Sequence, residues 1–230
     1  MSKRMAAVAE KVDASRSYTL AEAIDLLQSI PSVKFDETVE LHVRLGIDPK
    51  QSSQIVRSSV VLPHGTGKAV RICVLTRGEK AKEAEAAGAD VVGADDVVEK
   101  ITKGWMEFDV LIATPDMMKD IAKLGKVLGP RGLMPNPKTG TVTNEIAQAV
   151  ADTKKGRVEF RNDEYGIVHT IIGKKSFSKQ QLLENATALM DVVVKMKPAQ
   201  AKGEYLRSVT LSSTMGPGIT VDPAEFLRKK

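Results

Sequence analysis

The chain has 230 residues and is 42% apolar, which suffices for more than one buried core, so we expect two domains. Its 34 basic and 29 acidic residues leave a net charge of +5, too small to indicate any class of partner by itself. No segment approaches the ~20 apolar residues of a membrane span, the first residues lack the apolar stretch of a secretory signal, and a single cysteine excludes a disulfide framework, so we expect a cytoplasmic protein without a membrane partner.

The N-terminal part of the chain predicts one helix followed by strands. Thr19 and Glu22 form a capping-box pair, and apolar residues then recur at helical spacing until a proline ends the pattern. After this helix, alternation over residues 38–45 predicts a first strand whose buried face consists of Val39, Leu41, Val43 and Leu45. A second strand over residues 58–62 leads into the glycine-containing segment 63–67, which we interpret as a hinge.

The middle of the chain changes to short, continuous apolar strands that alternate with helical segments. This pattern is typical of a parallel sheet that is covered by helices on both faces. The strands are expected over residues 70–75, 91–92 and 110–113, and the helices over residues 80–87, 95–103, 116–123 and 144–153.

The C-terminal part returns to alternating strands. Residues 157–160 and 167–172 have the pattern of a β-hairpin, and Ser178 with Gln181 forms a second capping box that opens a long helix. The last strand, residues 205–214, points Val209 and Leu211 inward. Its other face is a row of hydroxyls, called here the hydroxyl ladder: Ser208, Thr210, Ser212 and Thr214. The apolar face expected for the long helix consists of Leu182, Leu183, Ala186, Leu189, Met190, Val193 and Met196.

The order of these elements predicts the fold class. Neither chain end has an obvious full core alone, yet the strand patterns of the two ends match. We therefore expect an α/β protein of two domains, in which a discontinuous α+β domain from both chain ends, residues 1–67 and 157–230, is interrupted by an inserted α/β domain, residues 68–156.

Charge is distributed unevenly along the chain. Residues 121–161 contain eight basic and three acidic residues, a net charge of +5, whereas residues 79–99 contain two basic and seven acidic residues, a net charge of −5. Such segregation favours one-sided contact with a polyanion.

Signals for an enzyme are weak. Residues 65–68 resemble a phosphate-binding loop only faintly, because the required spacing is not met and a strand follows instead of a helix. The histidines His42, His64 and His169 lie far apart in the sequence without metal-ligand spacing, and Cys73 lies in an apolar run that predicts a buried thiol. We expect no catalytic residue, no metal and no cofactor, with a nucleotide-dependent enzyme and a protein-interaction module as the alternatives.

A proline- and glycine-rich loop, residues 128–142, is the most informative stretch of the sequence. Its three prolines and three glycines favour a rigid path from which Arg131 and Lys138 project. Such a loop is either a tight connection or a contact surface, and its basic character favours the contact surface.

The hydroxyl ladder suggests another contact surface. Met215 and two glycines follow the ladder, and Lys34 and Phe35 precede the first strand, where we expect an exposed aromatic ring. Hydroxyls can contact riboses and exposed rings can stack on bases, so this surface is suited to RNA. Threonines also commonly fill the solvent faces of strands, and these residues alone leave both interpretations open.

Segments over nearly the whole chain resemble the L-one family of large-subunit ribosomal proteins in its bacterial form. The segments include KFDETVELHVRLGIDPK at residues 34–50, LPHGTGK at 62–68, LGPRGLMPNPKTGTV at 128–142, GRVEFRND at 156–163 and LRSVTLSSTMGPG at 206–218. The proline-glycine loop and the STMGP segment are the most specific of these.

The resemblance implies the two domains described above, with a Rossmann-like inserted domain, and a non-catalytic protein that binds large-subunit ribosomal RNA at the mobile stalk beside the tRNA exit site. It also implies binding to the leader of the chain's own mRNA, with repression of its translation, and proximity to exit-site tRNA. The free protein is expected to be a monomer. The RNA-binding residues implied for the first domain are Lys34, Phe35, Thr38, Ser208, Thr210, Ser212, Thr214, Met215 and Gly216, and Arg131 and Lys138 are expected to attract phosphates from the second domain.

Overall fold

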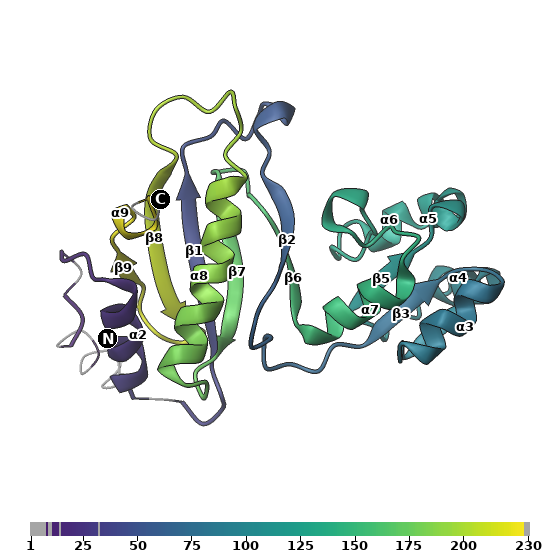
Figure 1. Cartoon of the computed structure of the whole chain (residues 1–230), viewed down its shortest axis with the longest axis horizontal. Helices are drawn as coiled ribbons and strands as arrows, with labels where there is room; N and C mark the ends of the chain where they lie inside the picture. Colours follow the sequence, from purple (N-terminus) through teal and green to yellow (C-terminus); the bar gives the residue numbers. More distant parts are fainter. Residues whose placement is uncertain (1–7, 9–10, 14, 32, 228–230) are drawn as a thin grey trace. The chain divides into compact units, whose positions relative to one another are not determined.

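The structure, a computed structural model, describes residue 8 and residues 11–13, 15–31 and 33–227. The first residues, in which we expect no secretory signal, lie largely outside this part. The chain folds into two compact units (Figure 1): one extends to Gly67 and resumes at Val158, and the other spans Lys68–Arg157. Among the described residues, no helix has both the length and the apolar character needed to cross a membrane.

A sheet covered by helices on one face forms most of the first unit. The strands of this sheet are β1 (Thr38–Leu45), β7 (Ile167–Lys174), β8 (Leu206–Ser213) and β9 (Ile219–Val221). The helices are α2 (Leu20–Ser29), α8 (Lys179–Lys195) and the short α9 (Ala224–Leu227). The strand order is β7-β1-β8-β9, and β1 pairs antiparallel with both β7 and β8. Because β1 and β8 come from opposite ends of the chain, this pairing joins the two ends into one sheet.

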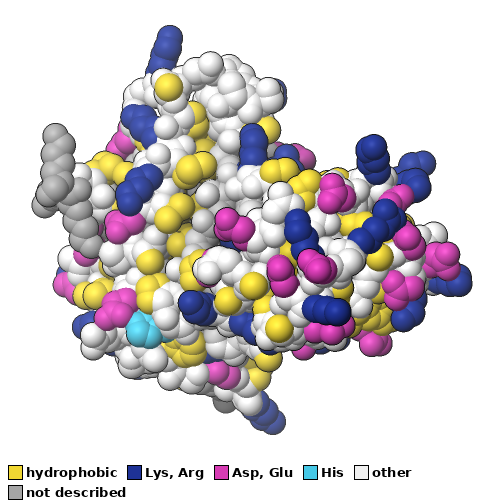
Figure 2. Space-filling model, turned by 45° about the vertical axis from the view of Figure 1, so that its right-hand side comes forward, with side chains coloured by type: hydrophobic (Ala, Val, Ile, Leu, Met, Phe, Trp, Pro, Cys, Tyr) yellow, Lys and Arg dark blue, Asp and Glu magenta, His cyan; other side chains and the backbone are white. Residues whose placement is uncertain are grey.

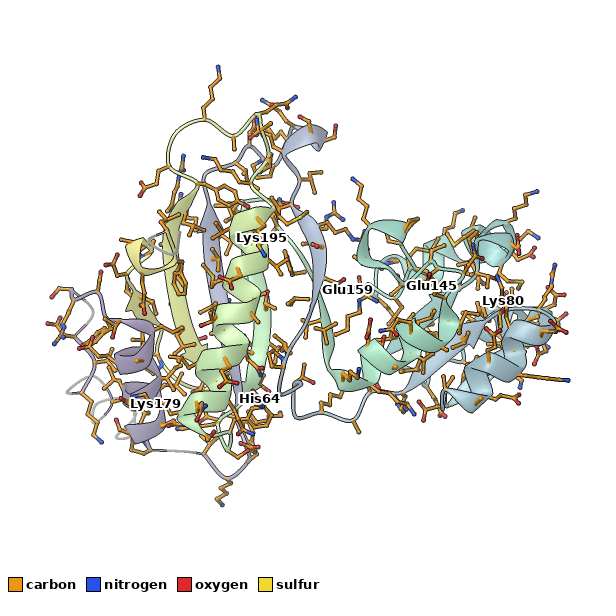
Figure 3. The ribbon with its side chains drawn as sticks, viewed as in Figure 1. His64, Lys80, Glu145, Glu159, Lys179 and Lys195 are labelled. Atoms are coloured by element: carbon orange, nitrogen blue, oxygen red, sulfur yellow. The ribbon has the colours of Figure 1, made fainter. Side chains whose placement is uncertain are left out.

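Local sequence signals explain how α2 and α8 begin. Both predicted capping boxes are present, with Thr19 and Ser178 as the capping residues of α2 and α8. The two helices lie beside each other, and Lys179 in the first turn of α8 (Figure 3) forms an ion pair with Asp25 of α2. The sequence therefore correctly places both helix starts.

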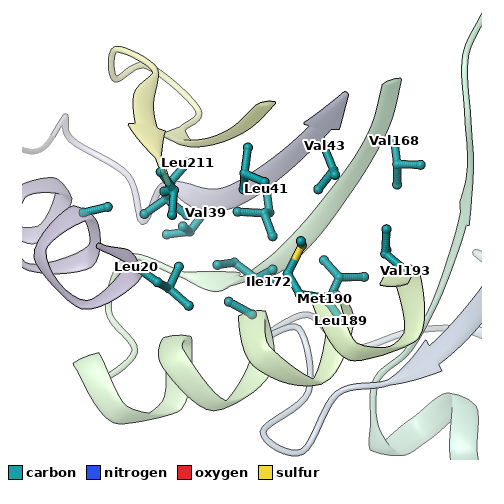
Figure 4. Packing of buried hydrophobic residues seen from close by; sticks show 14 of the residues in the cluster. Leu20, Val39, Leu41, Val43, Val168, Ile172, Leu189, Met190, Val193 and Leu211 are labelled. Carbon is teal, nitrogen blue, oxygen red and sulfur yellow. The ribbon is translucent and has the colours of Figure 1, made fainter. Parts of the chain in front are cut away.

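One hydrophobic core fills the first unit, with residues from both chain ends (Figure 4). The inward residues predicted for β1 are confirmed, since each is at most 1% exposed. The apolar face of α8 is confirmed except at Met196, which follows the helix and is 37% exposed because the chain turns away there. The core residues labelled in Figure 4 are Leu20, Val39, Leu41, Val43, Val168, Ile172, Leu189, Met190, Val193 and Leu211.

The hairpin predicted for residues 157–172 is wrong in its pairing. The strand β6 (Arg157–Arg161) forms a separate two-stranded sheet with β2 (Arg57–Val61), whereas β7 joins β1. Only one isolated bridge, between Asn162 and Val168, joins the two predicted partners in the described residues. Asn162 instead exchanges hydrogen bonds with Val56, through its amide and its side chain. The turn between the strands was predicted, but not the sheet to which each strand belongs.

The second unit has three layers, with a parallel sheet in the middle and helices on both of its faces. Its strands, in the order β4-β3-β5, are β3 (Ile72–Leu75), β4 (Val91–Gly93) and β5 (Val110–Ala113). Alternate residues of β3 enter two separate cores, as the continuous apolar pattern predicts: Ile72 and Val74 pack in one, and Cys73 and Leu75 in the other. The first core includes residues of α3 (Glu79–Ala86) and α7 (Ile146–Lys155), and the second includes residues of α4 (Asp95–Thr102), α5 (Met118–Lys123) and α6 (Gly125–Leu128).

Candidate nucleic-acid interface

The start of β1 and the end of β8 meet at one end of the four-stranded sheet. Val39 is paired with Ser213, and the next residues outward are joined by hydrogen bonds. The Thr214 amide donates to the Thr38 carbonyl at 3.0 Å, and the Thr38 amide donates to the Thr214 hydroxyl at 3.0 Å. The structure therefore brings together the two segments in which the sequence analysis placed its first-domain site residues.

The carboxylate of Glu37 lies beneath this junction and is completely buried. One carboxylate oxygen accepts hydrogen bonds from the Ser213 hydroxyl at 3.1 Å and from the Met215 amide at 3.0 Å. The other lies 3.4 Å from the ammonium group of Lys175, whose side chain is also buried and donates to the Ile30 carbonyl. Glu37 thus fixes the turn after β8 by an ion pair and two hydrogen bonds that are shielded from water.

Sequence reasoning missed Glu37 as a site residue. Its only signal was position: it directly precedes the alternating strand and is part of the segment that resembles a family motif. Its burial depends on β8, which begins more than 160 residues later in the chain. No local pattern could have indicated that.

Two large apolar residues flank Glu37, one close in sequence and one through its amide hydrogen bond, and both are exposed. Phe35 is 53% exposed and Met215 is 51% exposed, and Lys34 is also exposed. Gly216 keeps the turn close to β8, because a Cβ atom at this position would lie 2.4 Å from the Ser213 hydroxyl oxygen. We call this group the strand-end surface: Lys34, Phe35, Thr38, Thr214, Met215 and Gly216.

The hydroxyl ladder continues from the strand-end surface along the sheet face opposite the core. Register places Ser212, Thr210 and Ser208 opposite polar residues of β1. All three are half-buried, whereas Thr214 is exposed. Their partners in register are Glu40, His42 and Arg44, respectively.

Two of the three histidines, which lie far apart in the sequence, meet in the structure. His42 of β1 and His169 of β7 are direct partners across the sheet, with their Nδ1 atoms 2.9 Å apart. Antiparallel pairing brings together residues 127 positions apart, which sequence spacing does not reveal. Only His64 is separate, and it bonds Glu184 of α8 at 2.6 Å. In the part of the chain described, no group of three or more metal-ligating side chains was found.

Arg131 and Lys138 lie on the loop of the second unit, and both are exposed. The loop is held by its own polar groups: the Asn136 amide donates to the Thr141 hydroxyl at 2.9 Å, and the Lys138 amide donates to the Asn136 side chain at 2.8 Å. Thr139 is buried against Thr141. The sequence therefore correctly indicates an ordered loop that presents basic side chains.

The residues considered for catalysis have structural partners. In the loop that resembles a phosphate-binding loop, the His64 amide and the Gly65 carbonyl bond the buried Asn185 side chain, and Gly67 packs against Phe177. Burial, with a smaller effect from Asp96, raises the pKa of the Cys73 thiol to about 12, so this group is protonated at neutral pH. These contacts favour packing roles for the loop and the thiol.

Asp109 has a structural role of the same kind. Hydrogen bonds from Lys68, and then from Arg71, lower the pKa of its carboxyl group to about 2. A carboxylate held in this way is an ion-pair partner and a poor proton acceptor.

Taken together, these features define an α/β protein whose candidate site is an open, preformed polar surface at the end of a sheet. Residues 26–217 match the Ribosomal protein L1p/L10e family. Among curated relatives, the large ribosomal subunit protein uL1 of Thermobifida fusca is 56% identical over 96% of this chain and 94% of its own length. The protein of the same name from Chlamydia pneumoniae is 54% identical over 98% of this chain and 97% of its own.

The chain belongs to the Ribosomal protein L1p/L10e family. Its relatives bear the name of a ribosomal protein and not that of an enzyme. The match confirms the resemblance seen in the sequence motifs, and with it the expected ribosomal location in the cytoplasm.

Glu37→Gln tests the contribution of the buried ion pair to stability. Because Lys175 would remain buried without a countercharge, we expect the free energy of unfolding to fall by about 3–5 kcal/mol. Urea denaturation followed by circular dichroism measures this change. The matched control is Asp36→Asn, which removes the same charge from an exposed neighbour and should cost less than about 1 kcal/mol. Equal effects of the two substitutions would contradict the assigned role of Glu37.

Proposed function

We propose that this chain is a structural, non-catalytic component of the large ribosomal subunit and that it binds ribosomal RNA at the mobile stalk through the strand-end surface and the hydroxyl ladder. The observation that carries the proposal is the junction of Thr38 and Thr214 above the buried Glu37. The names of the relatives support the assignment to the large subunit.

The chemistry of the strand-end surface fits a folded RNA. The exposed ring of Phe35 can stack on a base, and short hydroxyl side chains allow a ribose to approach closely. The surface is already fixed by internal hydrogen bonds, so binding requires little ordering of side chains. These properties favour recognition of RNA shape by direct polar contacts.

Electrostatic attraction is expected to have a secondary role in specificity. On the face shown in Figure 2, Lys and Arg side chains are interspersed with Asp and Glu side chains. A mixed surface of this kind attracts phosphates weakly unless particular basic residues project from it. We assign that role to Arg131 and Lys138 on the ordered loop.

We further propose that the two compact units correspond to the discontinuous RNA-binding domain and the inserted Rossmann-like domain. The first would carry specificity, and the second would add phosphate contacts. Binding of the same surface to a similar fold in the chain's own mRNA leader would repress its translation. Exit-site tRNA would be a neighbour on the ribosome, and the free protein would be a monomer.

Thr214→Ala tests the strand-end surface directly. The substitution removes the hydroxyl that accepts from the Thr38 amide and that would contact the RNA. We expect the binding free energy to fall by about 1–3 kcal/mol, which is a loss of affinity of about fivefold to 150-fold. Filter binding to a stalk RNA fragment measures it, and Thr214→Ser, which keeps the hydroxyl, should bind nearly as tightly as the parent. An unchanged affinity for Thr214→Ala would show that the site is wrongly assigned.

Replacing Arg131 and Lys138 together by glutamine tests the electrostatic role of the loop. Each lost phosphate contact should reduce the slope of log affinity against log salt concentration by roughly 0.7–0.9. Filter binding at several salt concentrations gives this slope. Thr214→Ala serves as the control because it changes no charge and should leave the slope as it is. The proposal for the loop fails if the double variant retains the parent slope.

A further inference from the structure

A chain of hydrogen bonds crosses the polar face of the sheet and ends at the hydroxyl ladder. It begins in the turn before β7, where Asp163 Oδ2 lies 3.2 Å from His169 Nε2. The Nδ1 atoms of His169 and His42 are 2.9 Å apart, and His42 Nε2 lies 3.0 Å from the Ser212 hydroxyl. We call these four residues the histidine relay.

The proton positions in the relay follow from the Asp163 carboxylate at its end, which can only accept hydrogen bonds. A neutral His169 therefore carries its proton on Nε2 and accepts at Nδ1. His42 must then donate from Nδ1 and accept at Nε2. The Ser212 hydroxyl therefore donates to His42, which leaves its oxygen lone pairs available to a ligand. Every donor in the relay then has an acceptor.

The surroundings of the relay favour this arrangement at neutral pH. Burial alone would raise the pKa of Asp163, but hydrogen bonds from the Ile167 amide, from His169 and from the Tyr165 amide outweigh it and lower that pKa. The carboxyl group is thus ionised.

His42 is correspondingly neutral at pH 7. Burial lowers its pKa, and the carboxylate of Glu40, 3.7 Å from His42 Nε2, only partly opposes this. A neutral imidazole has one donor and one acceptor nitrogen, as the relay requires.

We propose that Asp163 is a positioning residue that acts through His169 and His42 to fix Ser212 as a hydrogen-bond acceptor toward the RNA. The inference rests on the function proposed above and adds a rule of specificity to it. Ser212 would select a hydrogen-bond donor of the RNA at this point, either a ribose 2′-hydroxyl or a base amino group. A phosphate oxygen, which only accepts, would be disfavoured there.

The first test needs no variant. Nitrogen-15 NMR of the histidine rings in the free protein should show the proton of His169 on Nε2 and that of His42 on Nδ1. The opposite tautomers, or rings that exchange between both, would overturn the proposal whether or not RNA binds.

Asp163→Asn tests whether the carboxylate sets the direction of the relay. The remaining oxygen can still accept from the Tyr165 and Ile167 amides, while the new amide group donates to His169 Nε2. Both histidine tautomers should therefore reverse, and Ser212 should become an acceptor from His42. We expect stalk RNA to bind about threefold to tenfold more weakly, as for one lost neutral hydrogen bond. Glu164→Gln, which removes the same charge from an exposed residue of the same turn, should change neither tautomers nor affinity.

A double-mutant cycle with Ser212→Ala shows whether the effect passes through Ser212. In that background Asp163→Asn should cause no further loss of affinity. An equal loss with and without the Ser212 hydroxyl would overturn the proposal. Repeating the cycle with RNAs that each carry one 2′-deoxy substitution identifies the donor. If the donor is a ribose hydroxyl, the coupling between Asp163 and Ser212 disappears for one of these RNAs. If it is a base amino group, the coupling persists for all of them.

The outcome also separates this inference from the proposed function. If Thr214→Ala binds normally, the strand-end surface is misassigned, whatever tautomers the two histidines show. If Thr214→Ala weakens binding but the tautomers do not reverse in Asp163→Asn, only the relay is wrong.

Discussion

The buried carboxylate of Glu37 is the interaction on which the rest of this surface depends. It bonds Ser213 and Met215, which lie 176 and 178 positions away in the sequence, and it is neutralised by Lys175. A buried ion pair is seldom the most stabilising solution, because both charges lose their hydration. Its value here is geometric: it holds the ends of β1 and β8 in one arrangement, so that the exposed residues around them form a fixed surface.

The candidate interface uses the same principle twice. Beneath the strand end, Glu37 positions the turn that carries Met215, and across the sheet face Asp163 is proposed to order Ser212 through two histidines. In both cases a carboxylate behind the surface determines what the surface presents. RNA binding to such a site would lose little conformational entropy, which allows short polar side chains to provide specificity.

The sequence predicted features that depend on neighbours along the chain. The capping residues Thr19 and Ser178 start their helices as expected, and alternation correctly identified the buried side of β1. Features set by long-range register were missed: β6 pairs with β2 instead of β7, and His42 meets His169. Glu37 was overlooked for the same reason, because burial of a charged residue at a strand start has no local pattern. The exposed residues of the candidate site were predicted from motifs, whereas the buried groups that hold them depend on long-range pairing that no local pattern shows.

Native-state hydrogen exchange of the free protein tests most directly whether the surface exists before RNA arrives. The amides of Thr214 and Met215 donate to Thr38 and Glu37, so they should exchange about as slowly as the Val209 amide within β8. If both instead exchange at the rate of an unstructured peptide while Val209 stays protected, the turn forms only on binding. A preformed surface would then be contradicted.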